Sequence, residues 1–185
     1  MCHALLHSPN FFALLLRIDR ELAAQTQSAG CPCSGRLHRA DYPRKPRGCL
    51  PELRSSVDRR FSFCCDVCRK RTTAQSVRFL GRRVYLGLVV VLSSSRHAGS
   101  NSAARLRAEL DIAWHTLQRW RAWWQDAFTR TPLWLGACGA FMPPLDAARL
   151  PEALLERFIG ADPAARLSAA LRFLAPLTAR GAHAA

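Results

Sequence analysis

The sequence predicts a mainly α protein with a small zinc-ribbon or zinc-knuckle region of short strands, then a helix-turn-helix and a C-terminal helical segment. Three observations predict this fold class. Two close pairs of cysteines are about thirty residues apart. Apolar side chains recur at helical spacing in several stretches. Hydrophobic residues make up 49% of the 185 residues, which is enough for a packed core.

We expect four segments along the chain: an N-terminal helix (1–29), a zinc knuckle with a basic connector (30–83), a helix-turn-helix (84–130) and a C-terminal helical segment (131–185). The first is an amphipathic helix over Phe11–Gln27, because Leu15, Ile18 and Leu22 recur at helical spacing. Asn10 is the candidate cap of this helix. Residues 36–60 are rich in Arg, Pro and Gly and suit a ribbon or an extended loop.

Two cysteine pairs, Cys31-x-Cys33 and Cys65-x-x-Cys68, form the strongest chemical pattern. Zinc prefers four soft or borderline ligands in a tetrahedron, and two close pairs on separate turns supply them from few residues. Pro32 and Gly35 in the first turn suit such a knuckle. The pattern predicts a zinc site with these four cysteines as ligands.

Other interpretations of the cysteines stay open at this point. Cys64 makes the second cluster ambiguous, and His38 or Cys49 are replacement ligands. The cysteines are alternatively ordinary buried residues of a decayed motif. A catalytic cysteine is the weakest interpretation, because no histidine is spaced to sit beside a thiol.

The stretch from Ser102 to Trp124 predicts a helix-turn-helix. Its helices are Ala103–Leu110 and Ala113–Gln125, and Asp111-Ile112 forms the turn. The second helix carries an apolar stripe made by Ala113, Leu117, Trp120 and Trp124. The opposite face carries side chains suited to reach base edges and phosphates: His115, Gln118, Arg119 and Arg121.

A plain helical hairpin in a core would show the same stripe. Trp114 and Trp123 fall off the stripe, and we expect them to pack against neighbouring helices or the C-terminal segment. The apolar run Val84–Leu92 is a buried strand or helix by length, and the helical residues that follow favour a helix.

The formal net charge of +14 is concentrated in one part of the chain. Residues 36–83 hold fourteen Lys and Arg against four acids, a net charge of +10. We expect two clusters in this connector to contact DNA phosphates, Arg44-Lys45-Arg47 and Arg69-Lys70-Arg71. The plainer interpretation is a soluble basic protein from an Arg-rich genome.

Targeting and membrane signals are not expected. The apolar run Phe11–Leu16 is short and is followed at once by charged residues, and no small-residue cleavage site ends it. Val84–Leu92 has about half the length that a membrane span needs. We therefore expect a cytoplasmic protein without membrane contact, in which the eight cysteines act as metal ligands or buried residues rather than as disulfides.

The chain resembles the zinc-ribbon plus helix-turn-helix region of bacterial insertion-sequence transposases and their small accessory proteins. The matching parts span roughly residues 30–127 and are Cys31-Pro32-Cys33-Ser34-Gly35, the run from Phe63 to Thr72, and Thr116-Leu117-Gln118-Arg119-Trp120. The resemblance implies binding to transposon ends or action as a repressor.

Two departures limit what the resemblance implies. The first cysteine pair is one residue shorter than usual. A transposase that cuts DNA also needs a large domain whose carboxylates bind two metal ions. The fewer than sixty residues after Arg130 carry only four acids: Asp146, Glu152, Glu156 and Asp162. We therefore expect a DNA-binding accessory protein, repressor or remnant and not an enzyme; a protein- or RNA-interaction module is the alternative.

The C-terminal segment predicts two packing helices, over Leu150–Ile159 and Ala164–Leu177. Pro151 suits the first turn of the earlier helix. A dimerisation role is a second interpretation, because helix-turn-helix proteins often bind paired half-sites as homodimers.

Overall fold

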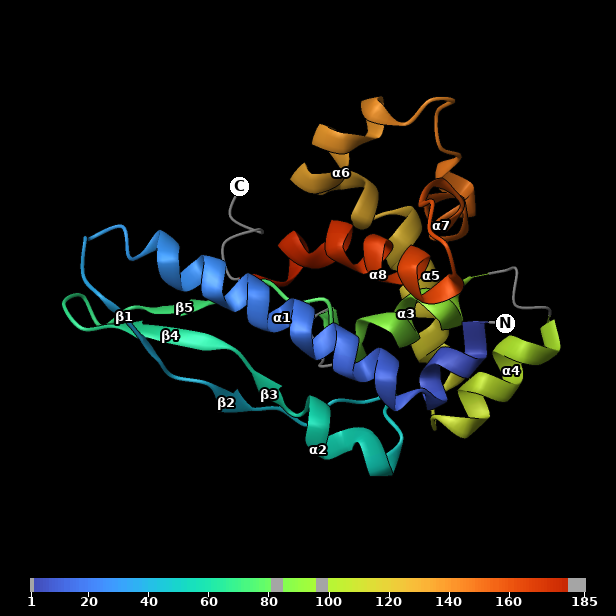
Figure 1. Ribbon diagram of the computed structural model, residues 1–185. Helices are drawn as coiled ribbons and strands as arrows, with labels where there is room; N and C mark the ends of the chain where they lie inside the picture. The colour runs from blue at the N-terminus through green and yellow to red at the C-terminus, as the bar shows by residue number, and fades with distance from the viewer. Residues whose placement is uncertain (1, 81–84, 96–99, 180–185) are drawn as a thin grey trace.

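A computed structural model describes residues 2–80, 85–95 and 100–179 of the chain (Figure 1). The protein is mostly helical with a few short antiparallel strands, which confirms the expected mainly α class. Most of the strands gather at one end of the molecule and most of the helices at the other, and the long helix α1 (Pro9–Ala29) runs along both parts.

Helix α1 begins two residues before the expected start. The cap is Ser8 rather than Asn10, and its hydroxyl accepts a hydrogen bond from the backbone N–H of Phe11 at 3.3 Å. Pro9 stands in the first turn, where its fixed φ and missing N–H fit a helix start. The helix ends at Gly30, whose φ of 72° is in the region that favours glycine.

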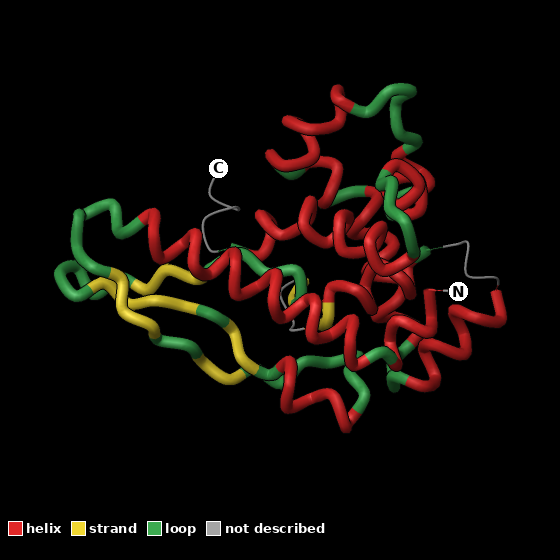
Figure 2. The backbone as a smooth tube through the Cα atoms, viewed as in Figure 1, coloured by secondary structure: helices red, strands yellow, loops and turns green. Residues whose placement is uncertain are grey.

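The strands form a ribbon that positions the cysteines (Figure 2). Strands β1 (Leu37–Arg39), β4 (Ser62–Cys65) and β5 (Arg71–Thr73) make an antiparallel sheet in the order β1-β4-β5. Strands β2 (Tyr42–Pro43) and β3 (Arg59–Arg60) pair beside it. The ribbon expected for residues 36–60 is thus present, and it also contains the short helices η2 (Pro51–Leu53) and α2 (Arg54–Val57).

The buried hydrophobic side chains of the described residues form two clusters. The larger one lies among the helices, and Leu15 and Ile18 of α1 belong to it. The smaller one lies under the sheet and contains Ala23 of α1 together with Phe63 and Cys65. Helix α1 therefore contributes to both clusters, and the cysteine turns rest on a small core of their own.

A buried ion pair joins α1 to the segment that follows β5. Asp19 accepts a hydrogen bond from Arg78 Nε at 2.6 Å, and both side chains are 1% exposed. The carboxylate also accepts from the Ser76 hydroxyl and the Val77 backbone N–H, each at 2.6 Å. The guanidinium of Arg78 lies over the ring of Phe61. This buried charge pair fixes the position of the segment on α1, although Nη1 of Arg78 is buried without a hydrogen-bond partner.

Three helices build the region expected to be a helix-turn-helix. Strand β7 (Tyr85–Leu86) pairs with β6 (Phe79–Leu80), so helix α3 begins only at Gly87 and runs to Ser94. The helix favoured for Val84–Leu92 is thus confirmed from Gly87 onward, and Val84 lies outside the described residues. Helices α4 (Ser100–Glu109) and α5 (Trp114–Gln125) both pack on the buried α3.

The C-terminal segment forms more, and shorter, helices than expected. Helix α7 covers only Glu152–Arg157, because Pro151 precedes it as cap and Phe158 turns to extended backbone. Helix α8 (Pro163–Leu174) continues into the 3-10 turn η6 (Ala175–Thr178). Before them come η3 (Phe128–Arg130), α6 (Pro132–Ala137), η4 (Cys138–Ala140) and η5 (Ala147–Arg149), and at the N-terminus η1 (Cys2–His7).

Candidate metal centre and DNA-contact residues

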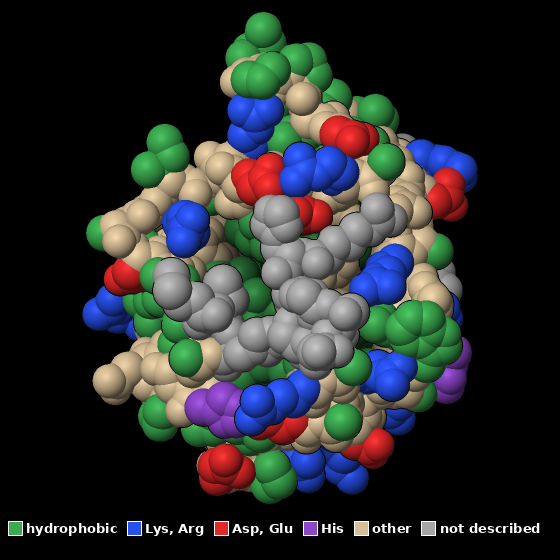
Figure 3. Space-filling view, turned by 90° about the vertical axis from the view of Figure 1, so that its right-hand side faces the viewer, with side chains coloured by type: hydrophobic (Ala, Val, Ile, Leu, Met, Phe, Trp, Pro, Cys, Tyr) green, Lys and Arg blue, Asp and Glu red, His purple; other side chains and the backbone are tan. Residues whose placement is uncertain are grey.

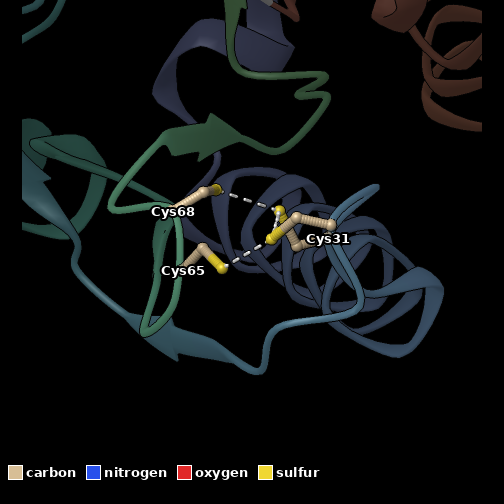
Figure 4. Close-up of side chains that lie close together, drawn as sticks. Cys31, Cys65 and Cys68 are labelled. Carbon is tan, nitrogen blue, oxygen red and sulfur yellow. Dashed lines mark hydrogen bonds between the residues drawn. The ribbon is translucent and has the colours of Figure 1, made fainter.

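The four expected cysteine ligands come together at the end of the ribbon (Figure 4). The Sγ atom of Cys31 lies 3.5 Å from that of Cys68 and 3.4 Å from that of Cys33. The sulfurs of Cys33 and Cys65 are also 3.4 Å apart. All four sulfurs lie within 4.8 Å of one another. Two turns that are distant in sequence thus converge on one point.

This arrangement fits a single tetrahedral metal ion. A Zn–S bond of about 2.3 Å places neighbouring sulfurs of a tetrahedron about 3.8 Å apart. The three contacts of 3.4–3.5 Å and the 4.8 Å limit bracket this spacing. The geometry could therefore hold a metal ion after small adjustments of the side chains.

The first turn approaches the second very closely. The Ser34 backbone N–H donates to the Cys31 carbonyl at 2.8 Å, and Ser34 has a φ of 65°. Gly35 follows, and a Cβ atom there would lie 2.4 Å from the Sγ of Cys65. Since no side chain fits in this space, the glycine is required for the two turns to meet.

The thiols of the first pair have opposed pKa shifts. The backbone N–H of Gly35, followed by the three neighbouring sulfurs, stabilises the Cys33 thiolate and lowers its pKa to about 6. For Cys31, the backbone N–H of Cys33 acts to lower the pKa, but the Cys33 sulfur, burial and the other two sulfurs raise it to about 12. Four sulfurs this close repel one another when ionised, and a divalent cation would relieve that repulsion.

The second turn is held by backbone hydrogen bonds and by a link to the first. The Cys65 N–H donates to the Lys70 carbonyl at 3.1 Å, and Arg69 has a φ of 58°. The Asp66 N–H donates to the Arg36 carbonyl at 3.1 Å, and the Arg36 N–H donates to Asp66 Oδ1 at 2.8 Å. These reciprocal bonds fix the relative position of the two turns.

The strand register decides between Cys64 and Cys65. Neighbouring residues of β4 point to opposite faces, and Cys65 is buried toward the small core. The Cys64 sulfur instead lies 3.5 Å from the Arg69 carbonyl. Cys65 therefore joins the cluster and Cys64 does not.

The other alternative ligands also lie apart from the four sulfurs. His38 contacts Asp66 through Nε2 at 3.4 Å, and it helps to lower the pKa of that carboxyl against the effect of desolvation. Cys49 packs against the larger cluster, where burial raises the pKa of its thiol to about 11. Neither residue belongs to the sulfur cluster.

The basic side chains of the connector lie on the ribbon. Arg69 and Lys70 are exposed in the second cysteine turn. Arg44, Lys45 and Arg47 are exposed after β2, where the Arg44 guanidinium lies 4.9 Å from the centre of the Tyr42 ring.

Arg71 is exposed, but contacts within the protein hold its side chain in place. Its guanidinium donates to the Ala40 carbonyl at 2.7 Å and lies over the ring of Tyr42, which belongs to β2. The contribution of Tyr42 to this surface was missed from sequence, because no local pattern indicates that Arg71 of β5 lies over its ring.

The expected apolar stripe of α5 is present from Leu117 onward. Leu117 and Trp124 are buried, and Trp120 packs edge-on against Tyr85 at 4.8 Å between ring centres. Ala113 is instead the exposed N-cap residue, so it does not contribute to the stripe. Asp111 forms the turn with a φ of 50°.

The polar residues expected to contact DNA divide into two groups. His115, Gln118 and Arg119 are exposed on α5. The Arg119 guanidinium donates to Thr116 Oγ1 at 3.2 Å. Arg121 is half-buried, and its Nε atom is buried without a hydrogen-bond partner.

The two tryptophans that lie off the apolar stripe, Trp114 and Trp123, differ in their surroundings. Trp123 packs against Phe128 of the following helix η3, with ring centres 5.6 Å apart, as expected of a residue in contact with neighbouring helices. Trp114 meets the neighbouring helix α4 through Arg107, but it is 54% exposed at the start of α5. It contacts the guanidiniums of Arg107 and Arg121. Sequence reasoning missed this cluster because helical periodicity does not specify how α4, which carries Arg107, crosses α5.

Charge on the molecule is unevenly distributed. On the face in Figure 3, the Lys and Arg side chains of the described residues lie singly or in pairs, with acidic side chains among them. Some carboxylates pair with arginines, as Glu152 and Glu156 do with Arg149. No helix within the described ranges is both long and apolar enough to cross a membrane.

Comparison of the chain with protein-family models, with curated proteins and with solved structures found no match.

Proposed function

We propose that the chain is a zinc-dependent DNA-binding protein of a mobile element, acting as an accessory protein, a repressor or a non-catalytic transposase remnant. The observation that carries the proposal is the convergence of four cysteine sulfurs within 4.8 Å, on turns that also present Arg69 and Lys70. A four-sulfur donor set with tetrahedral spacing suits zinc among the common metals. The bound ion would tie the two turns of a zinc ribbon together.

The surroundings of the sulfurs support DNA as the partner. Four thiolates and one Zn²⁺ carry a net negative charge, yet the adjacent side chains of Arg36, Arg69 and Lys70 are exposed cations. Among the described residues, these three side chains form no ion pair with a carboxylate. Cations held on a rigid turn and free of carboxylates suit contact with phosphates.

Helix α5 supports readout of base sequence. Its buried face rests on α3, and His115, Gln118 and Arg119 stand exposed on the other side. No acidic residue occurs between Trp114 and Gln125. A helix that offers donors without acids and is fixed from behind has the properties of a recognition helix in the major groove. Under this proposal α4, the Asp111 turn and α5 are the helix-turn-helix.

The positions of the carboxylates support a non-catalytic role. Asp146 and Asp162 accept hydrogen bonds from backbone N–H groups at the starts of η5 and α8. Glu152 and Glu156 contact Arg149. Acids engaged in capping and pairing are not arranged as a two-metal site for strand cleavage.

Selection of duplexes from a random DNA pool by the zinc-loaded chain tests the proposal. We expect an enriched sequence motif, and two copies at a fixed spacing would indicate a homodimer. Recovery of all sequences alike would contradict sequence-specific binding and favour the protein- or RNA-interaction alternative. Strand cleavage in the presence of Mg²⁺ or Mn²⁺ would contradict the non-catalytic assignment.

A further inference from the structure

Trp114 stands exposed beside two arginines at the start of α5. Its side chain is 54% exposed, although tryptophan is usually buried over most of its surface. The Arg107 guanidinium, from α4, lies 5.3 Å from the centre of the indole ring. The Arg121 guanidinium, from a residue about two turns further along α5, lies 6.0 Å from the centre of the same ring. The ring thus holds two arginines from different helices by cation–π contact.

Neither arginine is neutralised by the protein. Within the described part of the chain, the ion pairs leave Arg107 and Arg121 without a carboxylate partner. The Nε of Arg121 is buried and has no hydrogen-bond acceptor. A buried donor without an acceptor is unfavourable, so the guanidinium of Arg121 is not fully satisfied by the protein. A guanidinium pair of this kind matches the oxygens of a phosphate.

The backbone at the N-terminus of α5 also favours an anion. Ala113 is the N-cap of α5 and offers no side-chain oxygen to the first N–H groups of the helix. Helix α5 has twelve residues, so its N-terminus carries a positive partial charge. Both the side chains and the backbone therefore favour an anion beside Trp114.

We propose that Arg107 and Arg121 clamp one phosphodiester of the DNA backbone, and that Trp114 is the positioning residue that holds both guanidiniums for it. This inference rests on the proposed function and adds Arg107 and Trp114, which the sequence pattern did not assign, to the DNA contact of Arg121. The clamp gives affinity and fixes the register of α5 in the groove, and it carries no sequence preference of its own.

The salt dependence of DNA binding shows whether the two arginines contact a phosphate. Each phosphate neutralised by a cation adds about 0.9 to the slope of log K against log salt concentration. Loss of one such contact weakens binding about fivefold at physiological salt. A residue that merely stabilises the fold would not change this slope.

The experiment measures binding of a fluorescent 20-base-pair duplex of random sequence to the zinc-loaded full chain at several NaCl concentrations. The variants are W114A, W114F, the double variant R107Q/R121Q and the control L135A, which removes a side chain 64% exposed on α6. We expect the double variant to lower the magnitude of the slope by about 0.9, because one phosphate contact is lost, and W114A to lower it by a similar amount. W114F keeps an aromatic face and retains most of the slope, and L135A leaves it unchanged.

The outcomes separate this inference from the proposed function. A wild-type chain that binds no duplex overturns both. A wild-type chain that binds, with slopes unchanged in W114A and R107Q/R121Q, overturns the clamp alone. If W114A proves unstable by circular dichroism, the double arginine variant, which leaves the indole in place, still decides the question.

Discussion

A Cβ atom on Gly35 would lie 2.4 Å from the Sγ of Cys65. Real Cβ atoms do not approach another atom this closely. The glycine stands two residues after Cys33, and its backbone N–H also stabilises the thiolate of that residue. The absence of a side chain at position 35 is therefore part of what brings the two cysteine turns together.

The variant Gly35→Ala is expected to weaken the metal centre. The added methyl group forces the Cys65 sulfur or the first turn to move, and such overpacking costs about 1–3 kcal/mol. Competition with a chromophoric chelator and thermal unfolding measure the effect. Gly139→Ala is the matched control, because its added Cβ meets no atom within 4 Å. Equal metal affinity in the two variants would contradict the close contact.

Substitution of two adjacent cysteines tests the ligand set. Cys65→Ser removes a sulfur of the cluster and is expected to abolish stable metal binding, because oxygen is a poorer zinc ligand than thiolate. Cys64→Ser changes the neighbouring residue of the same strand, whose sulfur lies near the Arg69 carbonyl, and is expected to keep the metal. Metal retained by the Cys65 variant and lost by the Cys64 variant would show that the register of β4 is wrong.

The buried pair of Asp19 and Arg78 is expected to dominate the electrostatic contribution to stability. Asp19→Ala leaves the guanidinium buried without its partner, which costs about 3–5 kcal/mol. Glu21→Ala, on the same helix, breaks an exposed pair with Arg172, which is worth about 0–1 kcal/mol. Urea unfolding of both variants measures the difference. Similar losses in the two variants would mean that the ion pair does not hold the segment on α1.

Two basic side chains are expected to affect DNA binding in different ways. Arg119→Ala removes an exposed donor of α5 and is expected to cost about 1–3 kcal/mol on the selected sequence and less on others. Lys70→Ala is expected to weaken all sequences alike and to reduce the salt slope by about 1. Binding curves with the selected and a scrambled duplex measure both effects. A uniform loss in the Arg119 variant would assign that residue to phosphate contact instead.

The elements that sequence predicted well are those defined by local spacing. The stripe of Leu117, Trp120 and Trp124 predicted α5, and the two cysteine pairs predicted a common cluster. The choice between Cys64 and Cys65 could not be made from sequence, because it depends on the strand register that pairs His38 with Cys64.

The remaining features depend on long-range contacts. The Asp19–Arg78 pair joins residues 59 positions apart, and no local pattern indicates it. The exposure of Trp114 depends on how α4 crosses α5, which helical periodicity does not specify. The start of α3 at Gly87 depends on the pairing of Tyr85–Leu86 with β6.

The metal content of the purified chain tests the central claim most directly, because the ribbon and its basic turns depend on the four sulfurs. Elemental analysis of the folded wild-type protein is predicted to find about one zinc per chain, and the double variant Cys65→Ser/Cys68→Ser is predicted to lose both the zinc and the fold of the ribbon. A well-folded wild-type protein that contains no zinc and takes up none would contradict the account.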